Sequence, residues 1–166
     1  MEIKVIHIIT SLSSGGAQEM IYKKLKYRQS KNIKHYIVSL SEYTSKQDKI
    51  NSYVQKIYNI DFKNKFFFII NLILILKIIY NIKPNILQGW MYHGAFIALV
   101  INLLYIKKNK LKLIWNIRHS LYDIKKEKFT TRVIIKILSF NSKIPSNIIY
   151  NSSIGQKQHN NLGFNN

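Results

Sequence analysis

The chain has 166 residues, 47% of them hydrophobic, which is enough for one domain with a buried core. Cysteine is absent, so a disulfide framework and a thiolate metal site are excluded, and a reducing compartment such as the cytoplasm fits. The 26 basic residues stand against 7 acidic ones, a net charge of +19, and a surface this positive should attract anionic membranes, phosphorylated substrates or nucleic acid.

The first 25 residues predict a strand, a glycine turn and a helix. The run from Ile3 to Ile9 is β-branched and nearly continuous, which is typical of a strand buried on both faces of a parallel sheet. Gly15 and Gly16 leave the N-terminal N–H groups of the helix that begins at Ala17 uncovered, so this end suits a phosphate or another anion. Neither the dinucleotide fingerprint nor a P-loop is present, and a tight turn without a ligand is an equal alternative.

The rest of the sequence alternates between strand and helix patterns. Further strands are predicted at residues 34–40, 55–60, 85–89, 111–117 and 147–150, and residues 44–53 fit a loop or a short helix. Further helices are predicted at residues 64–81, stopped by Pro84, at 93–105 and 129–140, and after Ser152, with Gly163 as the C-terminal cap of the last. This alternation predicts an α/β fold: a doubly wound, mostly parallel sheet with helices on both faces.

The apolar segment at residues 66–82 allows two interpretations. It is shorter than the roughly 20 apolar residues that a membrane-spanning helix needs, and Asn71 and Lys77 interrupt it. The favoured interpretation is a helix buried against the sheet. The alternative is a helix that dips into a membrane interface, with lysines along its edge.

Two segments that follow predicted strands contain histidine. Ligands of a doubly wound sheet bind beyond the carboxyl ends of its strands, which here are the turns after Ile9, Gly89, Ile117 and Tyr150. The loops at residues 88–94 and 115–120 are therefore expected to open on the same edge as the glycine turn. A histidine there could bind sugar hydroxyls or phosphate, or act as a base, although a histidine after a strand is more often a satisfied loop residue.

Other chemistry finds little support. No nucleophile elbow and no His-Glu-x-x-His motif is present. Asp123 and Glu127 stand among lysines, which predicts local ion pairing rather than an acid and base pair. His159 lies near the end of a polar stretch and is expected to be exposed.

Four motifs in order along the chain resemble the N-terminal domain of a bacterial family-4 glycosyltransferase with the GT-B fold. They are His7-Ile8-Ile9-Thr10-Ser11-Leu12 with Gly15-Gly16-Ala17-Gln18-Glu19, Pro84 to His93, Trp115-Asn116-Ile117-Arg118-His119-Ser120, and Ile149-Tyr150-Asn151-Ser152-Ser153. The resemblance implies one Rossmann-like half of a two-domain enzyme that transfers sugar from a nucleotide-sugar with retention and without a metal. This half would hold a glycan or lipid-linked acceptor, as in polysaccharide biosynthesis.

The resemblance also implies residue roles. Gly15 and Gly16 match the loop that approaches the donor phosphates, and His119 matches the catalytic histidine that reaches the transferred sugar. Arg118 and Ser120 flank it and would contact the donor. The acceptor side would be formed by Trp90, Tyr92 and His93.

In the family, a second domain binds the donor through paired glutamates, and no such pair occurs in residues 1–166. The expectation is therefore a single N-terminal domain without its donor-binding half, inactive alone and completed by a separate chain, or a truncated gene remnant. A different alternative is a non-catalytic basic module that binds anionic membrane or nucleic acid, although only three arginines make nucleic acid the weaker case. Either form is expected in the cytoplasm, at the inner face of the membrane.

Overall fold

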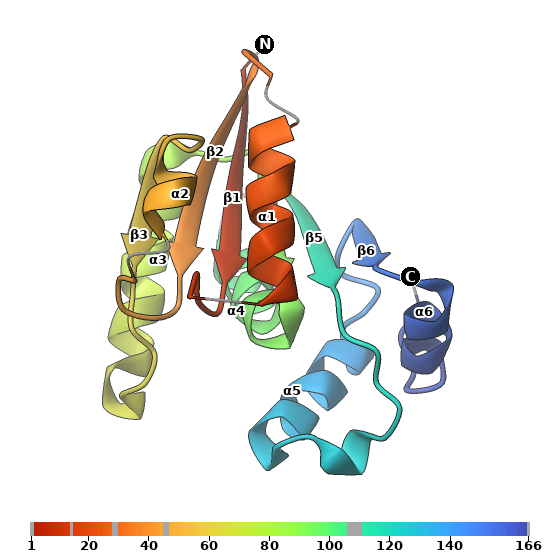
Figure 1. Cartoon of the computed structure of the whole chain (residues 1–166). Helices are drawn as coiled ribbons and strands as arrows, with labels where there is room; N and C mark the ends of the chain where they lie inside the picture. The colour runs from red at the N-terminus through yellow and green to blue at the C-terminus, as the bar shows by residue number, and fades with distance from the viewer. Residues whose placement is uncertain (1, 14, 28–29, 45–46, 106–110, 166) are drawn as a thin grey trace.

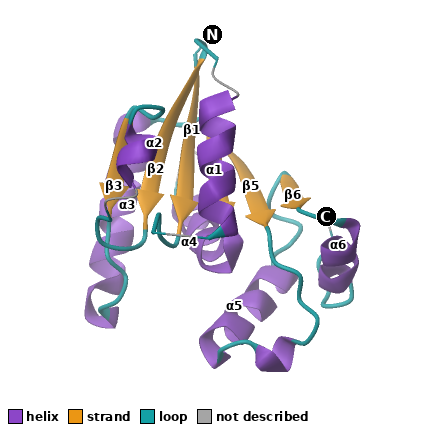
Figure 2. Cartoon of the chain, viewed as in Figure 1, coloured by secondary structure: helices purple, strands orange, loops and turns teal. Residues whose placement is uncertain are grey.

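The computed structural model describes all residues except 1, 14, 28–29, 45–46, 106–110 and 166, and it shows a six-stranded parallel sheet with helices on both faces (Figures 1 and 2). The strands are β1 (Ile3–Ile9), β2 (Ile33–Ser39), β3 (Lys56–Asn59), β4 (Ile86–Trp90), β5 (Lys112–Ile117) and β6 (Asn147–Tyr150). The helices are α1 (Gly16–Tyr27), α2 (Asp48–Asn51), α3 (Phe68–Ile82), α4 (Met91–Leu104), α5 (Phe129–Phe140) and α6 (Ser153–Asn160), with short 3-10 helices at Lys65–Phe67 and Ile124–Lys126. The predicted fold class is confirmed.

The strand order is β3-β2-β1-β4-β5-β6, so the direction of winding reverses between β1 and β4. All five pairings are parallel, and Ile8 at the centre lies opposite Val38 on one side and Gly89 on the other. Every strand therefore ends at the same edge, called here the carboxyl edge, which is the lower edge in Figure 1. This edge is where the predicted functional loops meet.

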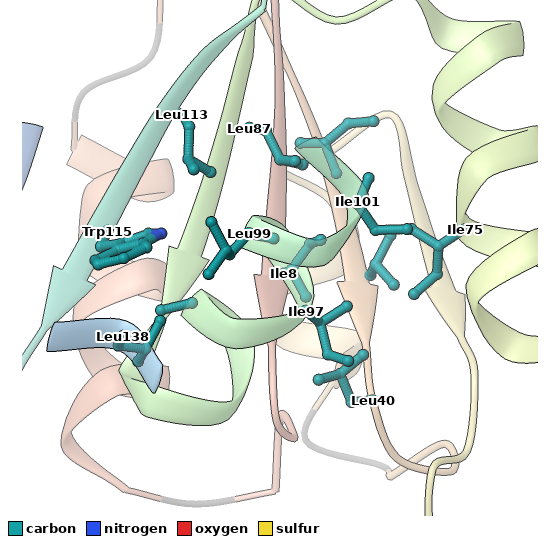
Figure 3. Close-up of a cluster of buried hydrophobic side chains, with 14 of the residues drawn as sticks. Ile8, Leu40, Ile75, Leu87, Ile97, Leu99, Ile101, Leu113, Trp115 and Leu138 are labelled. Carbon is teal, nitrogen blue, oxygen red and sulfur yellow. The ribbon is translucent and has the colours of Figure 1, made fainter. Parts of the chain in front are cut away.

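Two hydrophobic cores lie on opposite faces of the sheet because successive strand side chains point to opposite sides. The larger core joins the sheet to α3, α4 and α5. In Figure 3, Leu87 and Trp115 lie on the strands beside Leu99 of α4, with Leu138 of α5 at the same core. The smaller core packs α1 and α2 on the other face.

α4 follows β4 without a loop, which corrects the predicted loop at residues 88–94. The turn is made by Met91, whose φ of 59° is left-handed. Two glycines let α4 lie directly on the sheet. A Cβ on Gly94 would lie 2.5 Å from the carbonyl oxygen of Ile8, and one on Gly89 would lie 2.5 Å from the Cα of Ala95.

The predicted helix ends are confirmed at two positions. α3 ends at Ile82, and Lys83, which precedes Pro84, is left-handed with φ 54°. After α6, the N–H of Gly163 donates to the carbonyl of Asn160 and the N–H of Phe164 to that of His159. With Gly163 at φ 89°, this is a Schellman motif with the predicted glycine at its centre.

α3 packs one side against the core, as the favoured interpretation of residues 66–82 predicts, but its other side is exposed. Asn71, Leu72, Ile75 and Ile79 face the core. The opposite side exposes a set of large apolar side chains near the helix start, called here the α3 apolar face: Phe66, Phe67, Ile69, Ile70, Ile73 and Leu74. Phe66 is 94% exposed and Ile69 is 70% exposed. A contiguous group of large apolar side chains with so much exposed surface is unusual on a globular protein. No helix in the part of the chain that the structure describes is long and apolar enough to cross a membrane.

Candidate functional site

The loop after β5 carries the catalytic candidate and is held by hydrogen bonds between its own residues. Nε2 of His119 lies 2.9 Å from Oε1 of Glu127, and both side chains are partly exposed. The expected pairing of Glu127 with neighbouring lysines is therefore replaced by a bond to His119. Asp123 instead caps the short helix between them, accepting from the backbone N–H of Lys125 at 2.8 Å. The loop thus folds back so that a carboxylate orients the imidazole.

A buried chain of hydrogen bonds through Tyr92, His159 and Gly155 lies next to this loop. The Tyr92 hydroxyl lies 2.8 Å from Nε2 of His159, and Nδ1 of His159 lies 2.6 Å from the carbonyl of Gly155. Because a carbonyl only accepts, Nδ1 carries the proton in neutral His159, and Tyr92 donates to Nε2. Burial lowers the pKa of His159 and raises that of Tyr92, so both groups are neutral.

His159 is fully buried, so the prediction that it is exposed was wrong. Its ring packs edge-on against Phe164, and Tyr92 also meets the ring of His119 edge-on at 5.9 Å. α6 is further tied to the loop because Oε1 of Gln158 accepts from the N–H of Leu121 at 2.8 Å. α6 therefore serves as a support for the His119 loop.

Three hollows open around α1, α4 and the strand ends, and four of the predicted residues line them: Gly15, His93, Trp90 and Arg118. The first, about 390 Å³, is lined by Leu12, Ser13, Gly15, Gln18, Glu19, Tyr22, Lys49 and Ile50. Gly15 has a φ of 138°, and a Cβ there would meet Oε1 of Gln18 at 2.7 Å. Gly15 therefore borders the hollow in a backbone conformation that favours glycine.

The second hollow, about 430 Å³, contains His93 and is mainly apolar. Its other lining residues are Thr10, Ser11, Leu40, Ser41, Phe62, Lys63, Phe68, Phe96, Ile97 and Ile134. Burial and the charge of Lys128 lower the pKa of His93, so it is a neutral hydrogen-bonding group. It is the predicted acceptor-side residue that keeps access to a ligand.

Trp90 and Tyr92, the other two residues predicted for the acceptor side, are buried because the expected loop is strand and helix. Trp90 packs under α1 and donates from Nε1 to Nδ1 of His7 at 3.2 Å. His7 then donates from Nε2 to Nδ1 of His35 at 3.0 Å. Tyr92 is bonded to His159, whereas Trp90 also borders a hollow on the α1 side of the sheet.

Arg118 lies at the third hollow, about 400 Å³, on the α1 side of the sheet. It is shared with Met20, Lys23, Lys24, Tyr27, Trp90 and Asn116, and neither Gly15 nor His93 is among them. Arg118 and His119 therefore have different surroundings although they are adjacent in sequence. Ser120 is half-buried beside them. Among the described residues, no group of three or more metal-ligating side chains is gathered.

Two supporting residues were not recognised in the sequence. Glu127 is eight residues from His119, and this spacing does not match a turn or a helix that would bring the two side chains together. His159 stands four residues after Gly155, and the pair forms the buried side of α6. The four-residue spacing of Gly155 and His159, which places both on one side of a helix, was the one signal in the sequence that could have indicated the burial of His159.

Comparisons with known proteins support the fold. No protein-family model matches the chain, and no curated protein sequence does. Among solved structures, Anabaena Alr3699/HepE, solved in complex with UDP and glucose, matches 99% of the chain with a TM-score of 0.70 and 13% identity. A UDP-N-acetylglucosamine 2-epimerase matches 97% with a TM-score of 0.57 and 11% identity, and the Thermobaculum terrenum O-GlcNAc transferase matches 69% with 0.52 and 7%.

These neighbours support a GT-B-like fold for the chain, and at such identities they show the fold alone. The chain spans 42% of the length of HepE, 45% of the epimerase and 20% of the O-GlcNAc transferase. The described residues thus correspond to less than half of each neighbouring protein.

Proposed function

We propose that residues 1–166 form the acceptor-side part of a retaining glycosyltransferase that uses a nucleotide-sugar donor. The observation that carries the proposal is His119, held by Glu127 on the loop after β5 in a fold shared with a protein that binds UDP and glucose. In this proposal a donor-binding domain, on the same polypeptide or on another chain, supplies the remainder of the site. Residues 1–166 alone then transfer little sugar.

The proposed roles follow the geometry of the carboxyl edge. His119 contacts the transferred sugar, and its bond to Glu127 keeps the imidazole in place while the donor enters. Gly15 and Gly16 approach the donor phosphates with backbone N–H groups at the start of α1. Ser120 contributes a hydroxyl beside the sugar. No metal takes part, and the positive potential of the chain offsets the donor's negative charge.

The acceptor is proposed to be lipid-linked and to meet the enzyme at the inner face of the membrane. The apolar hollow around His93 and the α3 apolar face share the start of α3, where Phe68 lines the hollow. Lys63 is exposed shortly before α3, and Lys77 and Lys83 are exposed in its second half and at its end. Anionic headgroups attract such lysines. A peripheral position would bring the head of a lipid-linked acceptor to His93.

The donor site can be tested by nuclear magnetic resonance on the 15N-labelled chain. UDP-glucose and UDP-N-acetylglucosamine are expected to shift the amide signals of Gly15, Gly16 and His119, with a dissociation constant in the millimolar range because half of the contacts are absent. Glucose alone is the control and should shift none of them. Shifts confined to residues away from the carboxyl edge would contradict the assignment.

A further inference from the structure

The third hollow contains a charge imbalance that the proposed transfer does not use. Lys23, Lys24 and Arg118 line it, and none of the seven described lining residues is acidic. Lys23 has a distant ion pair, 3.7 Å to Glu19, with both side chains more than half exposed, so its charge is largely unneutralised. Nζ of Lys24 donates to the neutral Oε1 of Gln88 at 3.1 Å. The hollow therefore presents positive charge to solvent.

The positive potential also reaches the buried side chains behind the hollow. Burial is the main cause that lowers the pKa of His7 well below its usual value and that of His35 to about 4. The charge of Lys24 acts in the same direction on both. An anion in the hollow would offset this charge, since none of its described lining residues is acidic.

Asn116 also lines the hollow and offers a hydrogen-bond acceptor rather than a positive charge. It is 5% exposed, and its Oδ1 is buried without a hydrogen-bond partner. Its neighbours Trp115 and Ile117 point into the core beneath α4, so the side chain of Asn116 faces the α1 side and lines the hollow. Such an acceptor calls for a donor such as a hydroxyl group, which an inorganic anion alone does not offer.

The walls fit a small ring-shaped ligand. Trp90, which is almost fully buried, forms a rigid floor because its Nε1 is bonded to His7. Tyr27 and Met20 on α1 form exposed sides. A volume of about 400 Å³ lies within the usual range for small-molecule sites, and apolar walls with a few polar groups are typical of them.

We propose that this hollow is a binding site for a sugar phosphate, separate from the donor position at Gly15 and Gly16. Arg118 and Lys23 hold the phosphate, with Lys24 nearby, and Oδ1 of Asn116 accepts from a hydroxyl of the sugar. Arg118 then belongs to this site. The sequence resemblance had instead implied that it contacts the donor. The binding does not depend on glycosyl transfer and is measured without any nucleotide.

The test is a calorimetric titration of the 166-residue chain with glucose 1-phosphate and glucose 6-phosphate, with inorganic phosphate and glucose as separate arms. At least one sugar phosphate is expected to bind at least tenfold more tightly than either component. Arg118→Gln is expected to weaken that binding at least tenfold. Lys157→Gln removes one charge from an exposed position on α6 and is the matched control, expected to change it less than twofold.

Asn116→Leu supplies a second variant, because its side chain is close in size to asparagine and offers no oxygen to accept from a sugar hydroxyl. It is expected to abolish the advantage of the sugar phosphate over inorganic phosphate. Equal losses in Arg118→Gln and Lys157→Gln would mean unspecific attraction and would overturn the proposal. Inorganic phosphate binding as tightly as both sugar phosphates, or no saturable binding of either, would overturn it as well.

Discussion

Nε2 of His119 and Oε1 of Glu127 lie 2.9 Å apart, on either side of a short helix that follows β5. The carboxylate fixes one ring nitrogen of the imidazole and restricts its rotation. A histidine on a loop is thereby given a defined position at the carboxyl edge, which the sequence did not reveal.

Replacing Glu127 tests whether this contact matters for catalysis. In the proposed mechanism Glu127 positions His119 and does not touch the donor, so Glu127→Gln is expected to lower kcat by roughly 10-fold to 100-fold, as loss of an orienting partner does elsewhere. KM for the nucleotide-sugar should change little. The assay is sugar transfer by the chain joined to a donor-binding domain. Full activity of Glu127→Gln would remove the positioning role, and Glu42→Gln, at an exposed ion pair away from His119, is the control.

Tyr92→Phe removes the hydroxyl that donates to His159. The buried Nε2 of His159 would lose its partner, so the free energy of unfolding should fall by about 1–3 kcal/mol. Urea denaturation measures the change. Tyr122→Phe, at a side chain that is 84% exposed, is the control and should leave stability unchanged. Equal stabilities of the two variants would argue against the buried chain.

Gly94→Ala tests the contact between α4 and β1. The added methyl would lie 2.5 Å from the backbone oxygen of Ile8, which cannot move without disturbing the sheet. We expect a loss of about 1–3 kcal/mol or more in the free energy of unfolding. Gly16→Ala is the control, because a Cβ there meets nothing within 4 Å and alanine favours helix. Similar stabilities of the two variants would contradict the packing.

Acid should destabilise the fold through its buried and half-buried histidines. In the unfolded chain histidine titrates near pH 6.5, whereas burial lowers the pKa of His7 well below that and that of His35 to about 4. Between the unfolded and the folded pKa values the unfolded state binds more protons than the folded state. The contribution of these histidines to the free energy of unfolding is therefore complete above about pH 6.5 and decreases as the pH falls toward 4. The expected slope is about 1.4 kcal/mol per pH unit for each such histidine.

Urea denaturation at several pH values measures this slope. Burial also lowers the pKa values of His93 and His159, which adds to the slope with the same sign. His35→Asn should reduce it, since one titrating group is removed. A free energy of unfolding that is constant between pH 7 and pH 5 would contradict the buried neutral state of these rings.

The membrane proposal can be checked by cosedimentation with vesicles that contain phosphatidylglycerol. The double variant Ile69→Asn with Ile73→Asn removes part of the α3 apolar face and is expected to reduce binding at least tenfold. Leu103→Asn with Leu104→Asn is the control, because these side chains are similarly exposed on α4. Equal binding by both variants would assign the attraction to charge alone.

The strands were predictable because each is a short apolar run between turn residues, and β5 and β6 lie where the pattern placed them. The start of α4 was not predictable from the sequence. It depends on the left-handed conformation of Met91 and on the contact of Gly94 with the backbone of Ile8, and these two residues are far apart in sequence. The burial of His159 was missed for the same reason. Polar neighbours in sequence indicate exposure, whereas the packing of α6 against Tyr92 decides it.

The most direct test of the central claim is sugar transfer by the chain combined with a donor-binding α/β domain that carries paired glutamates. Radiolabelled UDP-sugars and a membrane lipid extract serve as donor and acceptor, and each domain alone is the control. Transfer by the combination that is lost at least 100-fold in His119→Ala, with the anomeric configuration of the donor retained in the product, is the predicted result. Rapid transfer by residues 1–166 alone, or unchanged transfer by His119→Ala, would contradict it.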